Sequence, residues 1–270
     1  MRMALPHLKP PGAAKLYIYE KCGARTSVED WPIPVVLAAV NDDGPGGRKD
    51  ECSAYLTHMV QASTSSSTAL YTIFMQADAL DHTRIELFDL VLQSMRHRTL
   101  DVPFLHLSQA RMVSSTSPCK RAIVQQATGR ALQRPLRGYC CAQFMVRRDI
   151  IVDPGPALWQ RALSAMDASL PDGCEGVRAA TGMHCLVYEA AWHFMLGKQE
   201  ELKPRSEDVE LPLFLRYPDA DHSNLPGAEN ATQYFRAVVA EDASAWIDAI
   251  TTKGLDLTGA RSMGYLPSES

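Results

Sequence analysis

The sequence lacks any uninterrupted apolar segment of the length that crosses a bilayer, which is about 20 residues. Residues 1–11 contain prolines and basic residues but no apolar stretch typical of a secretory signal. We therefore expect a soluble protein with no transmembrane segment. Its location stays open between the cytoplasm and the secretory lumen.

Motifs that identify several common enzyme classes are also missing. The chain contains no GxSxG, no P-loop, no Rossmann glycine fingerprint and no HExxH. Serine hydrolases of the nucleophile-elbow type, P-loop nucleotidases, classical dinucleotide enzymes and HExxH zinc proteases therefore lose their usual support.

Cysteines with metal-ligand spacing are absent. The chain has seven cysteines, and no two of them form a CxxC pair, which excludes zinc-ribbon and thioredoxin-like sites. The odd number leaves at least one thiol unpaired in a monomer. We expect Cys52, Cys140 and Cys141 to be buried thiols rather than disulfides. Cys174 and Cys185 flank a loop and could pair in an oxidising compartment.

Acidic residues are absent from Val102 to Arg148, although the net charge of the chain is −4. The segment carries eight basic residues: Arg111, Lys120, Arg121, Arg130, Arg134, Arg137, Arg147 and Arg148. Its positive field would suit a phosphate-bearing ligand, or the segment could be a solvated loop neutralised by the acidic residues beyond Glu200. We expect no nucleic-acid partner, because the segment lacks interleaved aromatic residues.

What the sequence does contain is an alternation of apolar segments with strand-like and helix-like periods. We expect strands over 15–20, 33–40, 69–76, 102–107 and 140–146, and helices over 50–61, 84–98, 158–166 and 186–196. This alternation favours an α/β fold with a mainly parallel, Rossmann-like sheet flanked by helices. With 270 residues, the chain would form an α/β domain over 1–205 and a C-terminal appendage over 206–270, with one amphipathic helix near 232–250.

Two segments carry polar groups in apolar surroundings. Gln143 lies inside the apolar run that precedes Arg147 and Arg148, and a buried amide must hydrogen-bond either a structural partner or a ligand. Glu189 and His193 are four residues apart and share one face of the expected helix. Glu189 is a candidate general base, or it could pair with His193 or with an arginine.

An acidic turn follows the expected strand 69–76. Asp78, Asp81 and His82 stand where ligands bind in open α/β sheets, and they could hold a divalent cation that bridges a diphosphate. Alternatively, Asp81 caps the helix that begins near Arg84. His58 and His106 are expected to be core or boundary histidines.

Five segments in order resemble the family described as domain of unknown function 3431. They are E-x-x-A-Y-L at Glu51–Leu56, the strand ending F-M-Q-A-D at Phe74–Asp78 with Asp81-His82, P-F-L-H-L at Pro103–Leu107, C-C-A-Q-F at Cys140–Phe144, and Y-E-x-x-W-H at Tyr188–His193. The resemblance covers about Lys15 to Lys198. The family itself brings no established activity.

The layout is more loosely similar to nucleotide-sugar glycosyltransferases of the GT-A type. That resemblance implies a Rossmann-like sheet and a bound Mn²⁺ or Mg²⁺ ion, although the chain has Ala77-Asp78-Ala79 where those enzymes carry Asp-x-Asp. By position, it implies a metal or nucleotide end at Asp78, Asp81 and His82. The implied catalytic residues are Glu189, as the candidate base, and Asp81. The implied substrate-binding residues are Gln143, Phe144, Arg147, Arg148, Trp192 and His193.

The expected function is therefore the transfer of a sugar from a nucleotide diphosphate donor to an unknown acceptor. The basic segment would stabilise the leaving diphosphate, because developing negative charge needs positive charge directed at it. Two alternatives remain open. One is a non-catalytic glycan- or nucleotide-binding protein, and the other is a metal-dependent hydrolase that uses Asp78, Asp81, His82 and His58.

Overall fold

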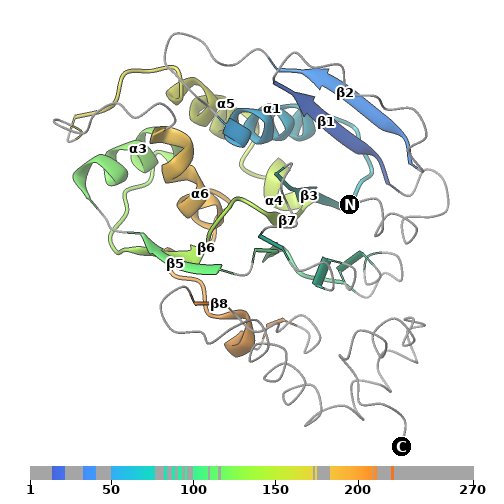
Figure 1. Ribbon diagram of the computed structural model, residues 1–270. Coiled ribbons are helices and arrows are strands. Elements are labelled where there is room, and N and C mark those ends of the chain that lie inside the picture. The colour runs from blue at the N-terminus through green and yellow to red at the C-terminus, as the bar shows by residue number, and fades with distance from the viewer. Residues whose placement is uncertain are drawn as a thin grey trace, which may run out of the picture.

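Figure 1 shows the computed structural model of the chain, with helices on one side of several short strands. The structure describes residues 14–21, 33–40, 50–76, 82–83, 87–88, 91–92, 95, 100–108, 110–114, 117–172, 174, 183–208, 210–211 and 220–221. The predicted helix near 232–250 and most of the predicted appendage lie outside these residues.

The strands of the described residues form three small sheets. β1 and β2 are parallel, β7 lies between β3 and β4 and is antiparallel to both, and β5 pairs antiparallel with β6 and parallel with β8. The strands are β1 (Leu16–Glu20), β2 (Val35–Ala39), β3 (Tyr71–Phe74), β4 (Phe104–His106), β5 (Ala110–Ser114), β6 (Leu136–Tyr139), β7 (Phe144–Arg147) and β8 (Ala220–Asp221).

The predicted α/β class is confirmed, but the mainly parallel sheet is not what the described residues form. Most pairings are antiparallel, and no clear Rossmann-like sheet is present in the described ranges. The short connections from β4 to β5 and from β6 to β7 lead the chain from one small sheet to another. The chain therefore does not build one continuous sheet strand by strand, as it would in a Rossmann-like fold.

The helices pack against one another beside the sheets. Contacts join α1 to α5 and α6, and α3 to α5 and α6 (Figure 1). In the described part of the chain, every helix is too short or too polar to cross a membrane. The helices are α1 (Asp50–Thr64), α3 (Pro118–Thr128), α4 (Arg148–Val152), α5 (Pro156–Ala165), α6 (Met183–Met195) and the short 3-10 helix η3 (Arg205–Glu207).

Helix α1 follows its predicted pattern. Cys52, Leu56 and Met59 lie on one face and have no exposed surface, because residues three or four apart point to the same side of a helix. Asp50 and Glu51 occupy the first turn, where negative charge interacts favourably with the helix dipole. The predicted helix over 50–61 is therefore confirmed, and it continues to Thr64.

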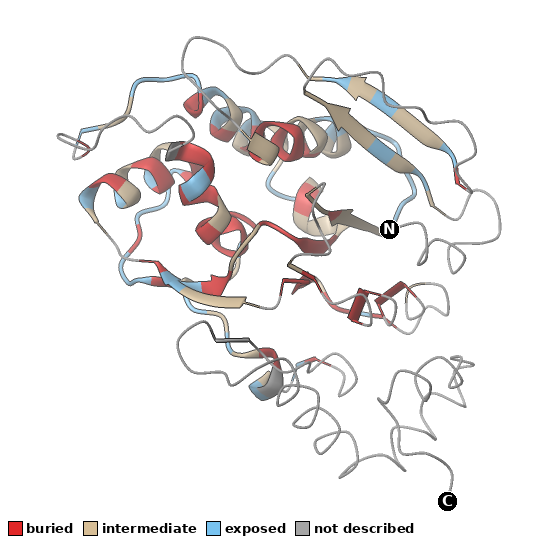
Figure 2. Ribbon diagram, in the orientation of Figure 1, coloured by how far each residue is buried: buried red, intermediate tan, exposed pale blue. Residues whose placement is uncertain are grey.

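An aromatic cluster of four rings joins the sheet β3-β7-β4 to the helices. It consists of Tyr55, Phe74, Phe144 and Trp192, with ring centroids 4.9 Å apart for Tyr55–Phe74, 5.0 Å for Phe74–Phe144 and 5.5 Å for Phe144–Trp192. All four side chains are buried in the core coloured red in Figure 2. Each ring comes from a different motif segment, so these segments meet in the core.

The segment between β4 and β7 is not the basic loop that the sequence suggested. It contains β5, α3 and β6. Ser117 caps α3 by accepting a hydrogen bond from the Lys120 N–H at 3.3 Å, and Gly129 ends the helix with φ of 73°. The many basic and amide residues of α3 make its apolar pattern weak in the sequence. In the structure, Ile123 and Val124 are nevertheless fully buried.

The predicted strand 140–146 is only half correct. Residues 144–147 form β7, whereas Cys140–Ala142 form a turn. Cys141 and Ala142 have positive φ values of 71° and 49°, a region that non-glycine residues seldom adopt. The apolar character of the run concealed this turn, and a disulfide joins its two adjacent cysteines.

Within the described residues, three disulfides replace the predicted buried thiols. They are Cys52–Cys185, Cys119–Cys174 and Cys140–Cys141. The predicted pairing of Cys174 with Cys185 is therefore wrong. Packing of α1 on α6 brings the Cα atoms of Cys52 and Cys185 to 5.5 Å, a separation that a disulfide spans, and the linear sequence does not reveal this contact. Cys22 lies outside the described residues.

Candidate functional site

Two glutamates from distant parts of the chain interact at the α1–α6 contact. Glu51 lies in the first turn of α1, and Glu189 lies in the middle of α6. Burial, followed by repulsion from Glu51 and Asp50, raises the pKa of Glu189 to about 7. We call Glu51, Glu189 and their neighbours Asp50, Gln76 and Lys21 the acidic site.

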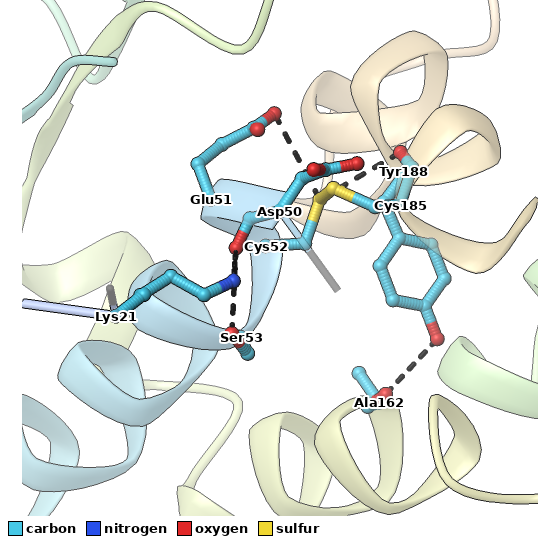
Figure 3. The surroundings of a disulfide bond; sticks show 8 residues. All are labelled: Lys21, Asp50, Glu51, Cys52, Ser53, Ala162, Cys185 and Tyr188. Atoms are coloured by element: carbon cyan, nitrogen blue, oxygen red, sulfur yellow. Dashed lines mark hydrogen bonds between the residues drawn. A yellow bond between two sulfur atoms is a disulfide. The ribbon is translucent and has the colours of Figure 1, made fainter. Parts of the chain in front are cut away.

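The local fold explains why these two side chains meet. Glu51 precedes Cys52, and Glu189 lies one helical turn after Cys185, to which Cys52 is bonded. On the α5 side, the Tyr188 hydroxyl donates a hydrogen bond to the Ala162 carbonyl at 3.0 Å (Figure 3). The disulfide and this hydrogen bond together fix the position of the part of α6 that carries Glu189.

Two strand ends contribute the remaining groups of the acidic site. Gln76 follows β3, and its side chain hydrogen-bonds Glu51. Lys21 follows β1, and its ammonium group donates to the backbone carbonyl of Asp50 (Figure 3). Asp50 has a φ of 42°, so a left-handed residue begins α1. The acidic site therefore lies beyond the carboxyl ends of β1 and β3.

The electrostatics of the site favour retention of a proton near neutral pH. Burial raises the pKa of Glu51, and its own backbone hydrogen bond and Gln76 act in the opposite direction. Two like charges that are partly buried together resist simultaneous ionisation. The pair therefore titrates as a unit, and its upper step, assigned to Glu189, falls near pH 7.

A carboxyl group with a pKa near 7 can exchange protons with a substrate under physiological conditions. General catalysis is most efficient when the pKa of the catalytic group lies close to the operating pH. Two carboxyl groups whose environments separate their pKa values provide an acid and a base in one site. Both glutamates are only half-buried, so solvent and a ligand have access to them.

The structure gives Gln143 a partner but does not satisfy it completely. Its side chain is fully buried, and its carbonyl oxygen accepts a hydrogen bond from the Thr83 hydroxyl. Its Nε2 atom has no hydrogen-bond partner in the described part of the chain. Phe144 and Trp192, two further predicted substrate contacts, belong to the aromatic cluster and have no exposed surface.

His193, predicted to bind substrate, has a structural environment. Its ring is fully buried, and Nε2 lies 3.0 Å from the carbonyl oxygen of Glu200. A Cβ atom at Gly138 would come within 2.9 Å of the His193 ring, so the ring packs directly on that backbone. Burial lowers the pKa of His193 to about 4, and the imidazole is therefore uncharged at neutral pH. Among the described residues, neither His193 nor an arginine pairs with Glu189.

Arg147 and Arg148 make contacts of their own at the end of β7. The Arg147 guanidinium forms ion pairs with Asp149 at 2.7 Å and with Asp101 at 2.8 Å. Arg148 donates a hydrogen bond to the carbonyl oxygen of Ser65. An anionic substrate would have to compete with these contacts. Substrate binding by Arg147 and Arg148 therefore stays a prediction from the sequence.

Three arginines of the basic segment contact residues 194–202. Arg137 forms an ion pair with Glu201 at 3.0 Å, and Arg111 donates to the carbonyl oxygen of Leu202 at 3.1 Å. Arg130 donates to the carbonyl oxygen of Phe194 at 2.9 Å and covers the Phe194 ring. Neutralisation by acidic residues beyond Glu200, one of the two sequence interpretations, therefore holds for Arg137.

The predicted metal site is described only in part. Asp78 and Asp81 lie outside the described residues, and His82 is a half-buried turn residue. Elsewhere in the described ranges, three potential ligand atoms lie within 4.8 Å of one another at Glu51, Cys52 and Cys185. Those two sulfur atoms are bonded to each other, so they are not thiolate ligands in this structure.

The two histidines expected in the core or at its boundary are found there. The His58 Nδ1 atom lies 2.9 Å from the Tyr19 hydroxyl, so His58 is occupied by a structural contact. His106 is buried beside the backbone of Gln143. Burial holds the pKa of His106 well below its usual value.

The sequence indicates Glu189 as a candidate acid but gives no sign of the acid that interacts with it. Acidic residues at a helix start, such as Asp50 and Glu51, are accounted for by the helix dipole alone, and the expected strand 69–76 ends at Gln76. A useful signal was nevertheless present, since Glu51, Gln76 and Glu189 each belong to one of the ordered motif segments. Nothing in one segment alone indicates that the three would converge.

Known proteins do not extend this assignment. No family model, curated protein or solved structure matches the chain. The resemblance to domain of unknown function 3431 therefore stays a prediction from the ordered motifs, and the function has to be argued from the acidic site.

Proposed function

We propose that the protein is a glycosyltransferase in which Glu189 is the general base. The observation that carries this proposal is the meeting of Glu189 with Glu51, where burial and repulsion raise the pKa of Glu189 to about 7. The substrates are a nucleotide diphosphate sugar and an acceptor with a free hydroxyl group.

The arrangement of the motif segments supports the proposal. The helix opening with Glu51, the strand end with Gln76 and the helix with Glu189 come from separate parts of the chain and contribute to one site. Ligands of α/β proteins commonly bind beyond the carboxyl ends of strands, and β1 and β3 both end at this site. The proposal extends to a GT-A-like relationship for residues 1–205.

The proposed reaction needs a single proton acceptor. The Glu189 carboxylate takes the proton of the acceptor hydroxyl while the hydroxyl oxygen forms a bond to the anomeric carbon of the donor sugar. The bond from that carbon to the diphosphate breaks, and the diphosphate leaves with the bonding electrons. Glu51 makes Glu189 a stronger base, because its negative charge favours the protonated form of Glu189.

The donor diphosphate requires positive charge near its leaving oxygen. We propose Asp78, Asp81 and His82 as the residues that would hold a Mn²⁺ or Mg²⁺ ion for this purpose, on the strength of their sequence pattern. The disulfides add a proposal about location, because such bonds persist in oxidising compartments. They favour the secretory lumen over the cytoplasm.

A thermal-shift panel of nucleotide diphosphate sugars tests the proposal, with each sugar offered in the presence of Mn²⁺, Mg²⁺ or a chelator. A donor at about 100 times its dissociation constant should add about 2.7 kcal/mol to the free energy of unfolding. We expect one donor to raise the melting temperature in a cation-dependent way and then to yield a glycosylated acceptor.

Three other outcomes would reject the proposal in different ways. A shift without turnover, for every acceptor offered, supports a non-catalytic binding protein. Release of free sugar at the same rate with and without acceptor supports a hydrolase. The absence of any shift, for a folded protein, removes nucleotide sugars as ligands.

A further inference from the structure

The disulfide Cys52–Cys185 links the two helices that carry the glutamates of the acidic site. Cys52 is the neighbour of Glu51 in α1, and Cys185 lies one helical turn before Glu189 in α6. Both cysteines are fully buried, and Glu51 Oε1 lies 4.0 Å from Cys52 Sγ (Figure 3). The covalent link therefore joins the backbone positions that carry the two acids.

The link opposes an electrostatic force. Glu51 and Asp50 on α1 repel the ionised form of Glu189, and Lys21, which follows β1, contributes a positive charge near Glu51. When both glutamates are ionised, repulsion drives α6 away from the first turn of α1. The disulfide opposes this movement, because it holds the two Cα atoms 5.5 Å apart.

We propose that the Cys52–Cys185 disulfide is the positioning element of the acidic site, and that its reduction separates Glu51 from Glu189. The positioning is argued from the disulfide and from the places of Glu51 and Glu189 next to its two cysteines, and its consequence for catalysis rests on the proposed function. In the reduced protein each carboxyl group gains water and loses its like-charged neighbour. Both changes remove the causes that make Glu189 a base near neutral pH.

The redox step is a thiol–disulfide exchange with a dithiol reductant. The reductant supplies two electrons and two protons, the sulfur–sulfur bond breaks, and Cys52 and Cys185 become two thiols. The reductant itself closes to a disulfide. Since Cys52 and Cys185 are fully buried, exchange requires local opening of the α1–α6 contact, and substitution is the cleaner way to remove the bond.

Carbon-13 NMR of the glutamate carboxyl groups, recorded over a pH series, tests this proposal. The double variant C52A/C185A removes the link, and C119A/C174A is the matched control because it removes another buried disulfide that flanks neither glutamate. The Glu189 signal is assigned by its loss in E189Q. We expect its titration midpoint to fall by about one to two pH units in C52A/C185A and to stay unchanged in the control.

A midpoint that stays near 7 in C52A/C185A would overturn the proposal, as would an equal fall in both double variants. Circular dichroism shows whether each variant is folded. If C52A/C185A does not fold, C52A/C185V, which refills part of the lost volume, replaces it with the same expected fall. The measurement needs no donor or acceptor, so it gives the same answer whether or not the protein transfers sugar.

Discussion

Replacement of Glu189 by glutamine is expected to lower the rate of sugar transfer by about 100- to 10,000-fold. Glutamine keeps the size of the side chain but cannot accept the hydroxyl proton. The protein should remain folded, because the substitution also removes a half-buried charge that is repelled by Glu51 and Asp50. Initial rates with the donor found by the thermal-shift panel measure this effect.

The pH dependence of the native enzyme separates a base from a merely nearby acid. Only ionised Glu189 accepts a proton, and its pKa is about 7. The rate should therefore fall about tenfold per pH unit below this value and level off above it. Glu207 is an exposed glutamate outside the acidic site, so E207Q is the matched control and should keep both the rate and the pH profile. An E189Q protein with the native rate would contradict the role of Glu189.

Replacement of Trp192 by alanine is expected to lower the free energy of unfolding by about 3–5 kcal/mol. The side chain has no exposed surface and contacts the rings of Tyr55, Phe144 and Tyr188, with centroids 5.8, 5.5 and 6.1 Å away. Removing it leaves a large cavity at the centre of the aromatic cluster. Urea denaturation followed by circular dichroism measures the loss.

W192F is the informative companion to W192A. The indole N–H of Trp192 has no hydrogen-bond partner among the residues that the structure describes, and an unsatisfied buried donor costs about 1–3 kcal/mol. Phenylalanine removes this donor while keeping most of the ring contacts, so W192F should lose much less stability than W192A. If W192A were as stable as the native protein but bound donor poorly, Trp192 would be a ligand residue, as the GT-A resemblance implies, and not a core residue.

Local patterns in the sequence predicted the elements that bury one face and expose the other. Helix α1 is the clearest case, since Cys52, Leu56 and Met59 recur at helical spacing and face the core. Helix α3 was not predicted, because arginine, lysine and glutamine residues alternate with its few apolar residues. The run at Cys140 shows the opposite error, because apolar composition suggested a strand where the backbone turns.

Pairing between distant segments could not be read from the sequence. β7 lies between β3 and β4, which both come from distant parts of the chain, and alternation of strands with helices does not specify this order. The same limit applies to the disulfides, because Cys52 and Cys185 meet only through the packing of α1 on α6. Glu189 was identifiable as an acid in apolar surroundings, whereas its relation to Glu51 required the folded chain.

The central claim is that Glu51 and Glu189 share one partly buried site in which Glu189 retains its proton up to about neutral pH. A carbon-13 NMR titration of the glutamate carboxyl groups in the native protein and in E51Q tests it most directly. We predict a Glu189 midpoint near 7 in the native protein and a lower one in E51Q, because removal of the Glu51 charge makes ionisation easier. A midpoint near the ordinary value of 4.5 in both proteins would show that the two acids do not interact, and would remove the basis for Glu189 as the general base.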